Sequence, residues 1–381
     1  MRRKLRVALA ALVVLLGALA IAGIIGGSWT AAQLRAVAVL STTEKTPVLA
    51  WTVRALTHEP RVEETFVGGA PSTVVRPGKG DGPWPSVVFV NGATRAGRHH
   101  EKVQRLARGL ARAGFLVVVP DLPGLRLGEI TPETADATVR AARATADRMD
   151  VRHGQIALYG VSVGATLALL AAESPALGGR VTVIGGEAPW VDLERVIRLA
   201  TTGFYKRERY ETDPYMQLAI ARSLAAGLAP GGGRSRLLGA LESVDDDDPT
   251  PLADLKAARY RGDLAALVRL LLNREPRRFA TLYARLSAHE RAAVVALSPL
   301  VKANHLQMPV ELATAPHDKY FPPAESRALA RAAPDVDVTV TSTLDHAVPR
   351  FSFGDFADLA RFDGFIVRFL RLAYVRSASQ G

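Results

Sequence analysis

A serine held between two glycines, at the junction of a strand pattern and a helix pattern, constrains this chain most. The stretch reads Gly160-Val161-Ser162-Val163-Gly164; it follows the apolar run 155–159 and precedes the helix-forming run 165–172. A sharp strand-to-helix turn strains the serine backbone, so positions two residues away on either side need almost no side chain. We therefore predict that the Ser162 hydroxyl stands above the edge of a sheet as a nucleophile elbow. A glycine-rich turn with a bystander serine is the alternative.

Strand and helix patterns alternate along two parts of the chain. The strand candidates are mostly continuous apolar runs, which is typical of strands buried on both faces. Their alternation with amphipathic helices predicts an α/β fold with a mostly parallel, doubly wound sheet covered on both faces. We expect strands at 61–67, 72–76, 86–90, 114–120, 155–159, 181–184, 309–315 and 337–341, and helices at 100–113, 131–149, 165–172, 324–333 and 356–374.

The alternation stops between residues 190 and 303, where helical patterns continue without a convincing strand. Such a stretch inside an α/β series predicts a helical cap over the carboxyl edge of the sheet, where these folds bind ligands. The core then comprises residues 61–189 and 304–381. Helices are expected at 191–201, 214–227, 252–259, 263–273 and 276–287. Aromatic residues here are candidates for lining an apolar pocket, with packing inside the cap as the alternative: Trp190, Phe204, Tyr205, Tyr210 and Tyr215.

The N-terminus has the pattern of a membrane segment. The basic residues at 1–6 precede an uncharged apolar stretch at 7–27, which would measure about 31 Å as a helix at ~1.5 Å per residue. A bilayer core is about 30 Å thick. We expect an uncleaved signal anchor in the cell membrane, with residues 1–6 in the cytoplasm, a juxtamembrane linker over 28–60 and the remaining chain outside the cytoplasm. Cleavage of a signal peptide near residue 38, giving a secreted protein, is the alternative.

Composition removes several classes of site. The chain has no cysteine among 381 residues, which excludes a disulfide scaffold, a cysteine nucleophile and a thiolate zinc site. Its net charge of +11 is spread along the predicted helices, as expected of solvated faces rather than a nucleic-acid surface. The run 245–248 is four consecutive aspartates and lacks the alternate spacing of a calcium loop. We expect no metal, no cofactor and no nucleic acid.

A serine nucleophile requires a base and a group that orients the base. Among the eight histidines, His346 follows the last predicted strand, which places it at the same sheet edge as the elbow. Asp318 follows the preceding strand, so it is the candidate that accepts the Nδ1–H of His346 and stabilises the imidazolium. Glu187, after strand 181–184, and Asp345, next to the histidine, are the alternative acids.

Two backbone N–H groups are candidates for stabilising an oxyanion. One belongs to Val163, directly after the serine. The other belongs to Ala93, in the loop after strand 86–90, where Gly92 permits close backbone approach and Asn91 braces the loop. An ordinary turn at the end of a strand is the alternative for this loop.

The order Ser162, Asp318, His346, together with the elbow and the Asn91-Gly92 loop, resembles the α/β-hydrolase fold superfamily. Dienelactone-hydrolase-like and prolyl-oligopeptidase-like enzymes are the most similar branches, and the resemblance covers about residues 60–190 and 305–375. Many relatives have His-Gly where this chain has Asn-Gly, so a lipase-type loop is not expected. The resemblance implies a cofactor-free serine hydrolase acting on a small-molecule ester or related acyl bond. A peptidase or acyltransferase of the same fold, and a non-catalytic envelope binding protein, are the alternatives.

Overall fold

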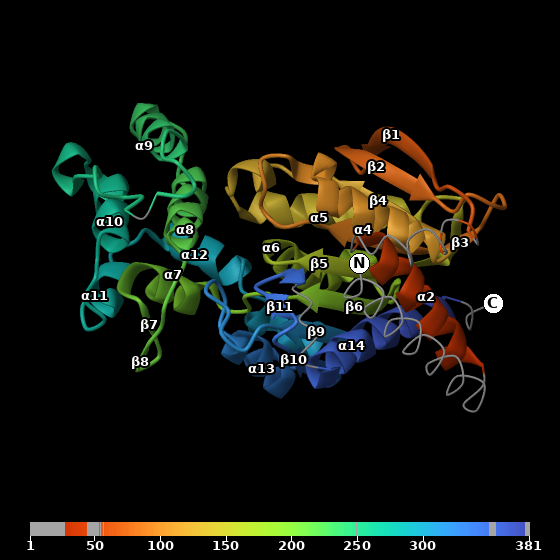
Figure 1. The fold of residues 1–381 in the computed structure, drawn as a ribbon. Helices are drawn as coiled ribbons and strands as arrows, with labels where there is room; N and C mark the ends of the chain where they lie inside the picture. The colour runs from red at the N-terminus through yellow and green to blue at the C-terminus, as the bar shows by residue number, and fades with distance from the viewer. Residues whose placement is uncertain are drawn as a thin grey trace, which may run out of the picture.

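The computed structural model describes residues 27–43, 53, 55, 57–248, 250–349 and 356–377. An eight-stranded sheet in the order β1-β2-β4-β3-β5-β6-β9-β10 lies at its centre (Figure 1). From β4 to β10 every neighbouring pair is parallel, whereas β2 is antiparallel to both β1 and β4. The expected mostly parallel sheet is confirmed. Its strands are β1 (Arg61–Val67), β2 (Ala70–Arg76), β3 (Trp84–Val90), β4 (Leu116–Pro120), β5 (Val151–Val161), β6 (Val181–Glu187), β9 (Val310–Thr314) and β10 (Val336–Val340).

Alternate side chains of the central strands pack into two separate apolar clusters, one on each face of the sheet. On β3, Val88 and Val90 belong to one cluster, whereas Val87 and Phe89 belong to the other. Helices α5 and α6 contribute to the first cluster, and α2, α4 and α14 contribute to the second. Burial on both sides explains why these strands are continuous apolar runs. The helices of the core are α2 (Ser28–Thr43), α4 (Glu101–Arg112), α5 (Pro132–Ala146), α6 (Val163–Ala172), α13 (Pro323–Ala332) and α14 (Phe356–Val375).

The segment expected as a linker, residues 28–60, contains helix α2, which packs against α4 and α14. Ala32 and Ala36 are fully buried there. The Gln33 side-chain amide also donates a hydrogen bond of 2.9 Å to Asp363 of α14. Because small residues on α2 allow close contact with both neighbours, the first part of this segment belongs to the folded core.

The predicted membrane anchor at residues 7–27 lies outside the described residues, except for Gly27. Among the helices that the structure does describe, none combines the length and the apolar character that a bilayer span requires.

The cap lies beyond the carboxyl edge of the sheet, at the left of Figure 1. A short hairpin, β7–β8, lies where the sequence predicted no strand, because Gly203 at φ 70° ends α7 and Lys206 at φ 55° closes the turn. The helix expected over 252–259 is instead a turn at 252–254 and a short 3-10 segment (Ala257–Arg259). The cap elements are α7 (Leu193–Thr202), β7 (Phe204–Tyr205), β8 (Glu208–Arg209), α8 (Pro214–Ala226), α9 (Gly232–Glu242), α10 (Gly262–Leu271), α11 (Phe279–Tyr283) and α12 (Ala288–Ala296).

A buried carboxylate of α13 attaches the cap to the core. Oε2 of Glu325 accepts hydrogen bonds from the backbone N–H groups of Val191 and Asp192, both at 2.9 Å. Oε1 accepts a hydrogen bond of 2.6 Å from the Tyr205 hydroxyl. Glu325 is fully buried, and this burial raises the pKa of its carboxyl. The first turn of the cap is therefore positioned by a side chain of the core.

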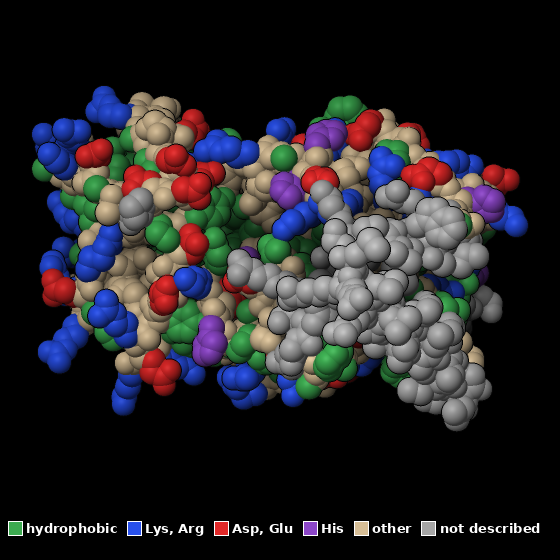
Figure 2. Space-filling view, in the orientation of Figure 1, with side chains coloured by type: hydrophobic (Ala, Val, Ile, Leu, Met, Phe, Trp, Pro, Cys, Tyr) green, Lys and Arg blue, Asp and Glu red, His purple; other side chains and the backbone are tan. Residues whose placement is uncertain are grey.

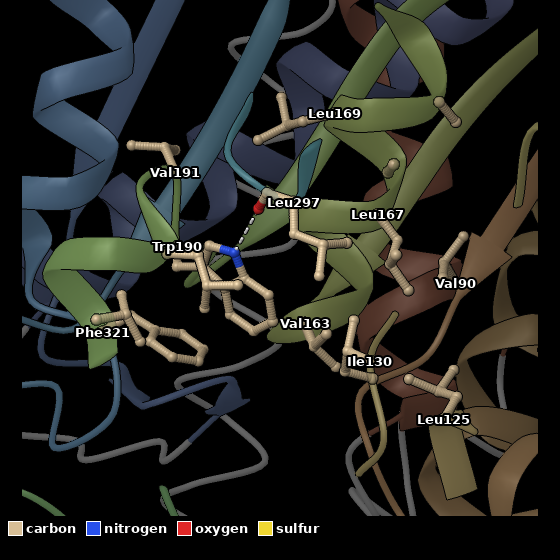
Figure 3. Close-up of a cluster of buried hydrophobic side chains, with 14 of the residues drawn as sticks. Val90, Leu125, Ile130, Val163, Leu167, Leu169, Trp190, Val191, Leu297 and Phe321 are labelled. Atoms are coloured by element: carbon tan, nitrogen blue, oxygen red, sulfur yellow. Dashed lines mark hydrogen bonds between the residues drawn. The ribbon is translucent and has the colours of Figure 1, made fainter. Parts of the chain in front are cut away.

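Trp190, the first residue of the cap, is the second attachment. Its indole N–H donates a hydrogen bond of 3.0 Å to the carbonyl oxygen of Leu297, as Figure 3 shows. Its own carbonyl accepts a hydrogen bond of 2.8 Å from the Thr166 hydroxyl of α6. The ring packs edge to face against Phe321 at a centroid distance of 5.2 Å. Trp190 therefore links the helix of the elbow to the cap.

Candidate active site

Ser162 lies between β5 and α6 with φ 56° and ψ −128°, a conformation that residues other than glycine seldom adopt. A Cβ atom on Gly160 would lie 2.3 Å from the carbonyl oxygen of Gly164. A Cβ atom on Gly164 would lie 2.1 Å from the carbonyl oxygen of Val90. Neither glycine can therefore carry a side chain unless the backbone moves, which is the steric requirement expected for this turn.

The structure brings the three sequence-predicted side chains together in a hydrogen-bonded chain. His346 Nε2 lies 2.8 Å from Ser162 Oγ, and His346 Nδ1 lies 2.8 Å from Asp318 Oδ2. The carboxylate is completely buried, and its Oδ1 also accepts hydrogen bonds from the N–H groups of Tyr320 (2.8 Å) and Phe321 (3.0 Å). These bonds hold the carboxylate so that it can fix the orientation of the imidazole.

His346 occupies the turn of a two-stranded hairpin, β11–β12 (Leu344–Asp345 and Val348–Pro349), with φ 54°. Two aromatic rings enclose its imidazole, Tyr320 at a centroid distance of 4.4 Å and Phe321 at 5.6 Å. Sequence reasoning did not assign these rings to the site. Their position two and three residues after Asp318 is the signal that could have identified them.

Neither alternative acid takes the place of Asp318 beside His346 Nδ1. The backbone oxygen of Glu187 accepts the Ser162 N–H at 2.7 Å, but its buried carboxylate accepts a hydrogen bond from the Tyr159 hydroxyl. Burial raises the pKa of this carboxyl to about 7. The side chain of Asp345 is exposed to solvent. The residue that the structure pairs with His346 is therefore Asp318.

The predicted oxyanion donors lie beside the serine. Val163 and Ala93 both line the cavity that contains Ser162, and neither N–H donates a hydrogen bond to another residue in the described part of the chain. A Cβ atom on Gly92 would lie 3.4 Å from the Cβ of Ser162, so the loop approaches the serine closely. Asn91 is buried, and its side-chain amide donates a hydrogen bond of 2.8 Å to the Gly92 carbonyl. The loop can therefore present an N–H to an anionic oxygen.

A cavity of about 420 Å³ contains Ser162 and His346 in its wall. Its lining comes from both apolar clusters, so the cavity extends from the sheet edge toward both faces of the sheet. Figure 2 shows hydrophobic side chains in the hollow between cap and core. One part, the cap arm, is lined by Ile130, Val163, Trp190, Met216, Ile220 and Phe321. The other part, the α14 arm, is lined by Phe89, Tyr159, Val161, Glu187, Phe362 and Ile366.

The aromatic candidates of the cap divide into two groups. Trp190 and Tyr215 line the cavity, as the sequence suggested. Tyr205 bonds to Glu325 instead, and the Tyr210 hydroxyl donates a hydrogen bond of 2.7 Å to the backbone oxygen of Asp318. Tyr210 therefore holds the cap against the loop that carries Asp318, and Tyr205 holds it against α13. Phe204 is not among the residues that line the cavity.

The acidic run of the cap forms ion pairs with arginines. Asp246 lies 2.8 Å from the buried guanidinium of Arg222 and 3.2 Å from that of Arg95. Arg95 follows β3, so these contacts join the cap loop to the loop on the other side of the cavity. Within the residues described, no cluster of three or more side chains could hold a metal ion.

Three solved structures illustrate what this chain is similar to. The thermostable carboxylesterase EstE1, cloned from a metagenomic library, is 17% identical over 92% of this chain and 99% of its own, with a TM-score of 0.46. A hyperthermophilic esterase from Pyrobaculum calidifontis is 17% identical over 87% and 88%, with a TM-score of 0.45. A puromycin-hydrolyzing peptidase from Mycobacterium tuberculosis is 19% identical over 83% of this chain but only 38% of its own, with a TM-score of 0.44.

A search of curated proteins gave no match. A family model described as alpha/beta hydrolase fold matches residues 85–349, a span that starts in β3, includes the elbow and the whole cap, and ends after His346. This span is more than half of the chain. On this match, this chain belongs to the α/β-hydrolase fold family.

Proposed function

We propose that this protein is a serine hydrolase that cleaves a carboxylic ester or a related acyl bond through an acyl-enzyme on Ser162. The observation that carries the proposal is the continuous chain of two hydrogen bonds, 2.8 Å each, from the Ser162 hydroxyl through His346 to the buried Asp318. A hydroxyl, an imidazole and a carboxylate in this order are the parts that nucleophilic acyl transfer requires.

In the first half of the reaction, Ser162 Oγ attacks the carbonyl carbon while its proton passes to His346 Nε2. The positive charge that develops on the imidazole is stabilised by Asp318, which already lies 2.8 Å from Nδ1. The carbonyl oxygen becomes anionic and accepts hydrogen bonds from the Val163 and Ala93 N–H groups. When the tetrahedral intermediate collapses, His346 gives the proton to the departing alcohol, and the acyl group remains on the serine.

In the second half, a water molecule takes the place of the alcohol. His346 accepts a proton from the water as its oxygen attacks the acyl carbon, and then returns that proton to Ser162 Oγ as the carboxylic acid leaves. No cofactor enters either half. The apolar lining of the cap arm and the α14 arm favours a substrate with hydrocarbon on one or both sides of the scissile bond.

The location of the enzyme is a separate part of the proposal. The uncharged stretch 7–27 after the basic residues 1–6 supports a signal anchor with the catalytic domain outside the cytoplasm. Carbonate washing of membranes tests it: an anchored protein stays in the pellet with its N-terminus intact. Recovery of a soluble form that begins near residue 39 contradicts it.

A fluorophosphonate probe tests the chemistry. We expect wild-type protein to be labelled and to hydrolyse 4-nitrophenyl esters, and Ser162→Ala to do neither. A matched control is Ser342→Ala, because Ser342 lies outside the cavity wall and its hydroxyl bonds to Asp358. Absence of labelling in the wild type, or equal labelling of Ser162→Ala, would refute the proposal.

A further inference from the structure

The α14 arm contains one carboxyl group that the proposed mechanism does not use. Glu187 is the last residue of β6, is 5% exposed and lines the same cavity as Ser162. No lysine, arginine or histidine in the described part of the chain forms an ion pair with it. A buried carboxyl without a cationic partner is unfavourable unless other groups satisfy it. Its presence in the cavity wall therefore calls for a reason.

Only one of the two carboxyl oxygens is satisfied by the described protein. Oε1 accepts a hydrogen bond from the Tyr159 hydroxyl. Oε2 has no hydrogen-bond partner among the described residues. It is also not fully enclosed by the protein, so part of its surface stays accessible. Since Glu187 is otherwise buried and lines the cavity, the exposed part of Oε2 faces the space where a substrate would lie.

The surroundings hold this acceptor in a fixed direction. Tyr159 packs at centroid distances of 5.9 Å from Phe89 and 5.0 Å from Phe369, so its hydroxyl is held in place by aromatic contacts. The neighbouring wall of the α14 arm is apolar and includes Phe362 and Ile366. One oriented polar group in an apolar pocket is the usual means by which a binding site fixes the position of its ligand.

The ionisation of Glu187 favours a neutral donor over an ammonium group. Burial raises the pKa of Glu187 to about 7, so the carboxyl exchanges between its two forms near neutral pH. A hydroxyl can pair with either form, since it donates to a carboxylate and accepts from a carboxylic acid. An ammonium group can pair only with the carboxylate.

We propose that Glu187 is a specificity-determining residue, and that Oε2 receives the hydroxyl of a hydroxylated substrate chain lying in the α14 arm. This inference rests on the proposed function, because it assumes that Ser162 forms the acyl-enzyme. The backbone contact of 2.7 Å between Ser162 N–H and the Glu187 oxygen places the two residues side by side. The recognised hydroxyl is therefore expected within a few bonds of the scissile carbonyl.

The test compares esters that differ in one polar group. Two sets of esters are used, one with the variable chain on the acyl side and one with it on the alcohol side. Each set contains an unsubstituted (plain) hydrocarbon chain, chains of equal length with a hydroxyl at successive positions, and the matching amino chains. We expect one hydroxyl isomer to exceed its plain counterpart in kcat/KM by about tenfold to a hundredfold, the range for satisfying a buried acceptor. The ratio of hydroxyl to plain ester should fall to about one in Glu187→Leu.

Two further variants separate recognition from structural support. Glu187→Gln keeps an oxygen acceptor and should retain part of the preference, and Tyr159→Phe should lower it by loosening the carboxyl. The matched control is Glu311→Gln, because Glu311 is also buried but lies on β9, outside the cavity wall, and bonds to Arg368. The ratio of hydroxyl to plain ester in Glu311→Gln should equal that of the wild type. A purely structural Glu187 would change all esters equally.

The outcomes distinguish this inference from the proposed function. If the ratio of hydroxyl to plain ester is the same in wild type and Glu187→Leu, and both proteins are labelled at Ser162, the role of Glu187 is refuted while the serine hydrolase proposal stands. A preference for the amino chain would also overturn the role of Glu187. Failure of the wild type to react with the fluorophosphonate would refute the serine hydrolase itself.

Discussion

Replacing Asp318 by asparagine tests the orienting carboxylate with little change in shape. In the structure, Oδ1 accepts the Tyr320 and Phe321 N–H groups at 2.8 and 3.0 Å. His346 Nδ1 lies nearer to Oδ2, at 2.8 Å, than to Oδ1, at 3.0 Å. An asparagine amide oxygen can keep both backbone bonds. Its NH₂ group then faces Nδ1, which must become the acceptor. The remaining imidazole proton moves to Nε2, where it points at Ser162 and the nitrogen can no longer take the serine proton.

The expected loss in kcat is about 10⁴-fold, the effect of a wrong histidine tautomer in a triad. At 1.36 kcal/mol per tenfold change, this is about 5.4 kcal/mol of transition-state stabilisation. The free energy of unfolding should change much less, because the two backbone bonds to the side chain persist. Activity and stability should therefore separate in this variant.

Steady-state hydrolysis of 4-nitrophenyl butyrate gives kcat and kcat/KM, and urea denaturation gives the stability of the same preparations. Asp345→Asn is the matched control: it makes the same chemical change next to His346, at an exposed side chain, and should retain the activity of the wild type within about twofold. Loss of less than tenfold in Asp318→Asn, or a larger loss in Asp345→Asn, would show that Asp318 does not orient the base.

Three further predictions concern stability. Gly164→Ala should lower both activity and the free energy of unfolding, the latter by at least about 2 kcal/mol, because the new Cβ would lie 2.1 Å from a backbone oxygen. Gly239→Ala should stabilise the protein instead, because no atom lies within 4 Å of the new Cβ in α9. Urea curves like that of the wild type for both variants would contradict this prediction. Glu325→Ala leaves two backbone N–H groups without their acceptor and should cost about 3 kcal/mol, with faster proteolysis at the cap; unchanged proteolysis and stability would show that the carboxylate does not hold the cap. Burial raises the pKa of Glu173 from 4.5 to about 8, so the folded protein keeps a proton that the unfolded chain releases between these pH values. At ~1.4 kcal/mol per pH unit, the free energy of unfolding should fall by up to about 4 kcal/mol as pH rises from 4.5 to 8. Glu173→Gln should remove this fall, and parallel pH profiles of the two proteins would contradict it.

Local sequence patterns were sufficient to predict the strands of the sheet and that most of them are parallel. The strands that make it are runs of apolar residues whose two faces are both buried, as at Val87 and Val88 of β3, so their identity does not depend on distant contacts. The elbow was equally predictable from the sequence, because the steric limits on Gly160 and Gly164 are set by residues close to them in the chain or on the adjacent strand.

Features that depend on tertiary contacts were less accessible. Helix α2 is stabilised by burial of Ala32 and Ala36 against two helices, and small residues alone do not reveal such partners. The hairpin that carries His346 has strands of two residues each, too short for a periodic pattern. The sequence nonetheless predicts that His346 lies at the edge of the sheet that carries Ser162, because His346 follows the final strand of the sheet.

The roles of individual side chains also depend partly on tertiary contacts. The strand order favours Asp318 over Glu187, and in the structure Asp318 contacts His346 whereas the Glu187 carboxyl accepts a hydrogen bond from Tyr159. That hydrogen bond joins residues 28 positions apart, and nothing in the local sequence of either residue predicts it. The Glu325 contacts with the cap are also long-range and were not anticipated.

Mapping of the acyl-enzyme tests whether Ser162 is the nucleophile. Wild-type protein is mixed with a 4-nitrophenyl ester, quenched in acid within the first turnover, digested and examined by mass spectrometry. We expect one acyl group, on the peptide that contains Ser162, and none in Ser162→Ala. An acyl group on another residue, or turnover without any acylated peptide, would contradict it.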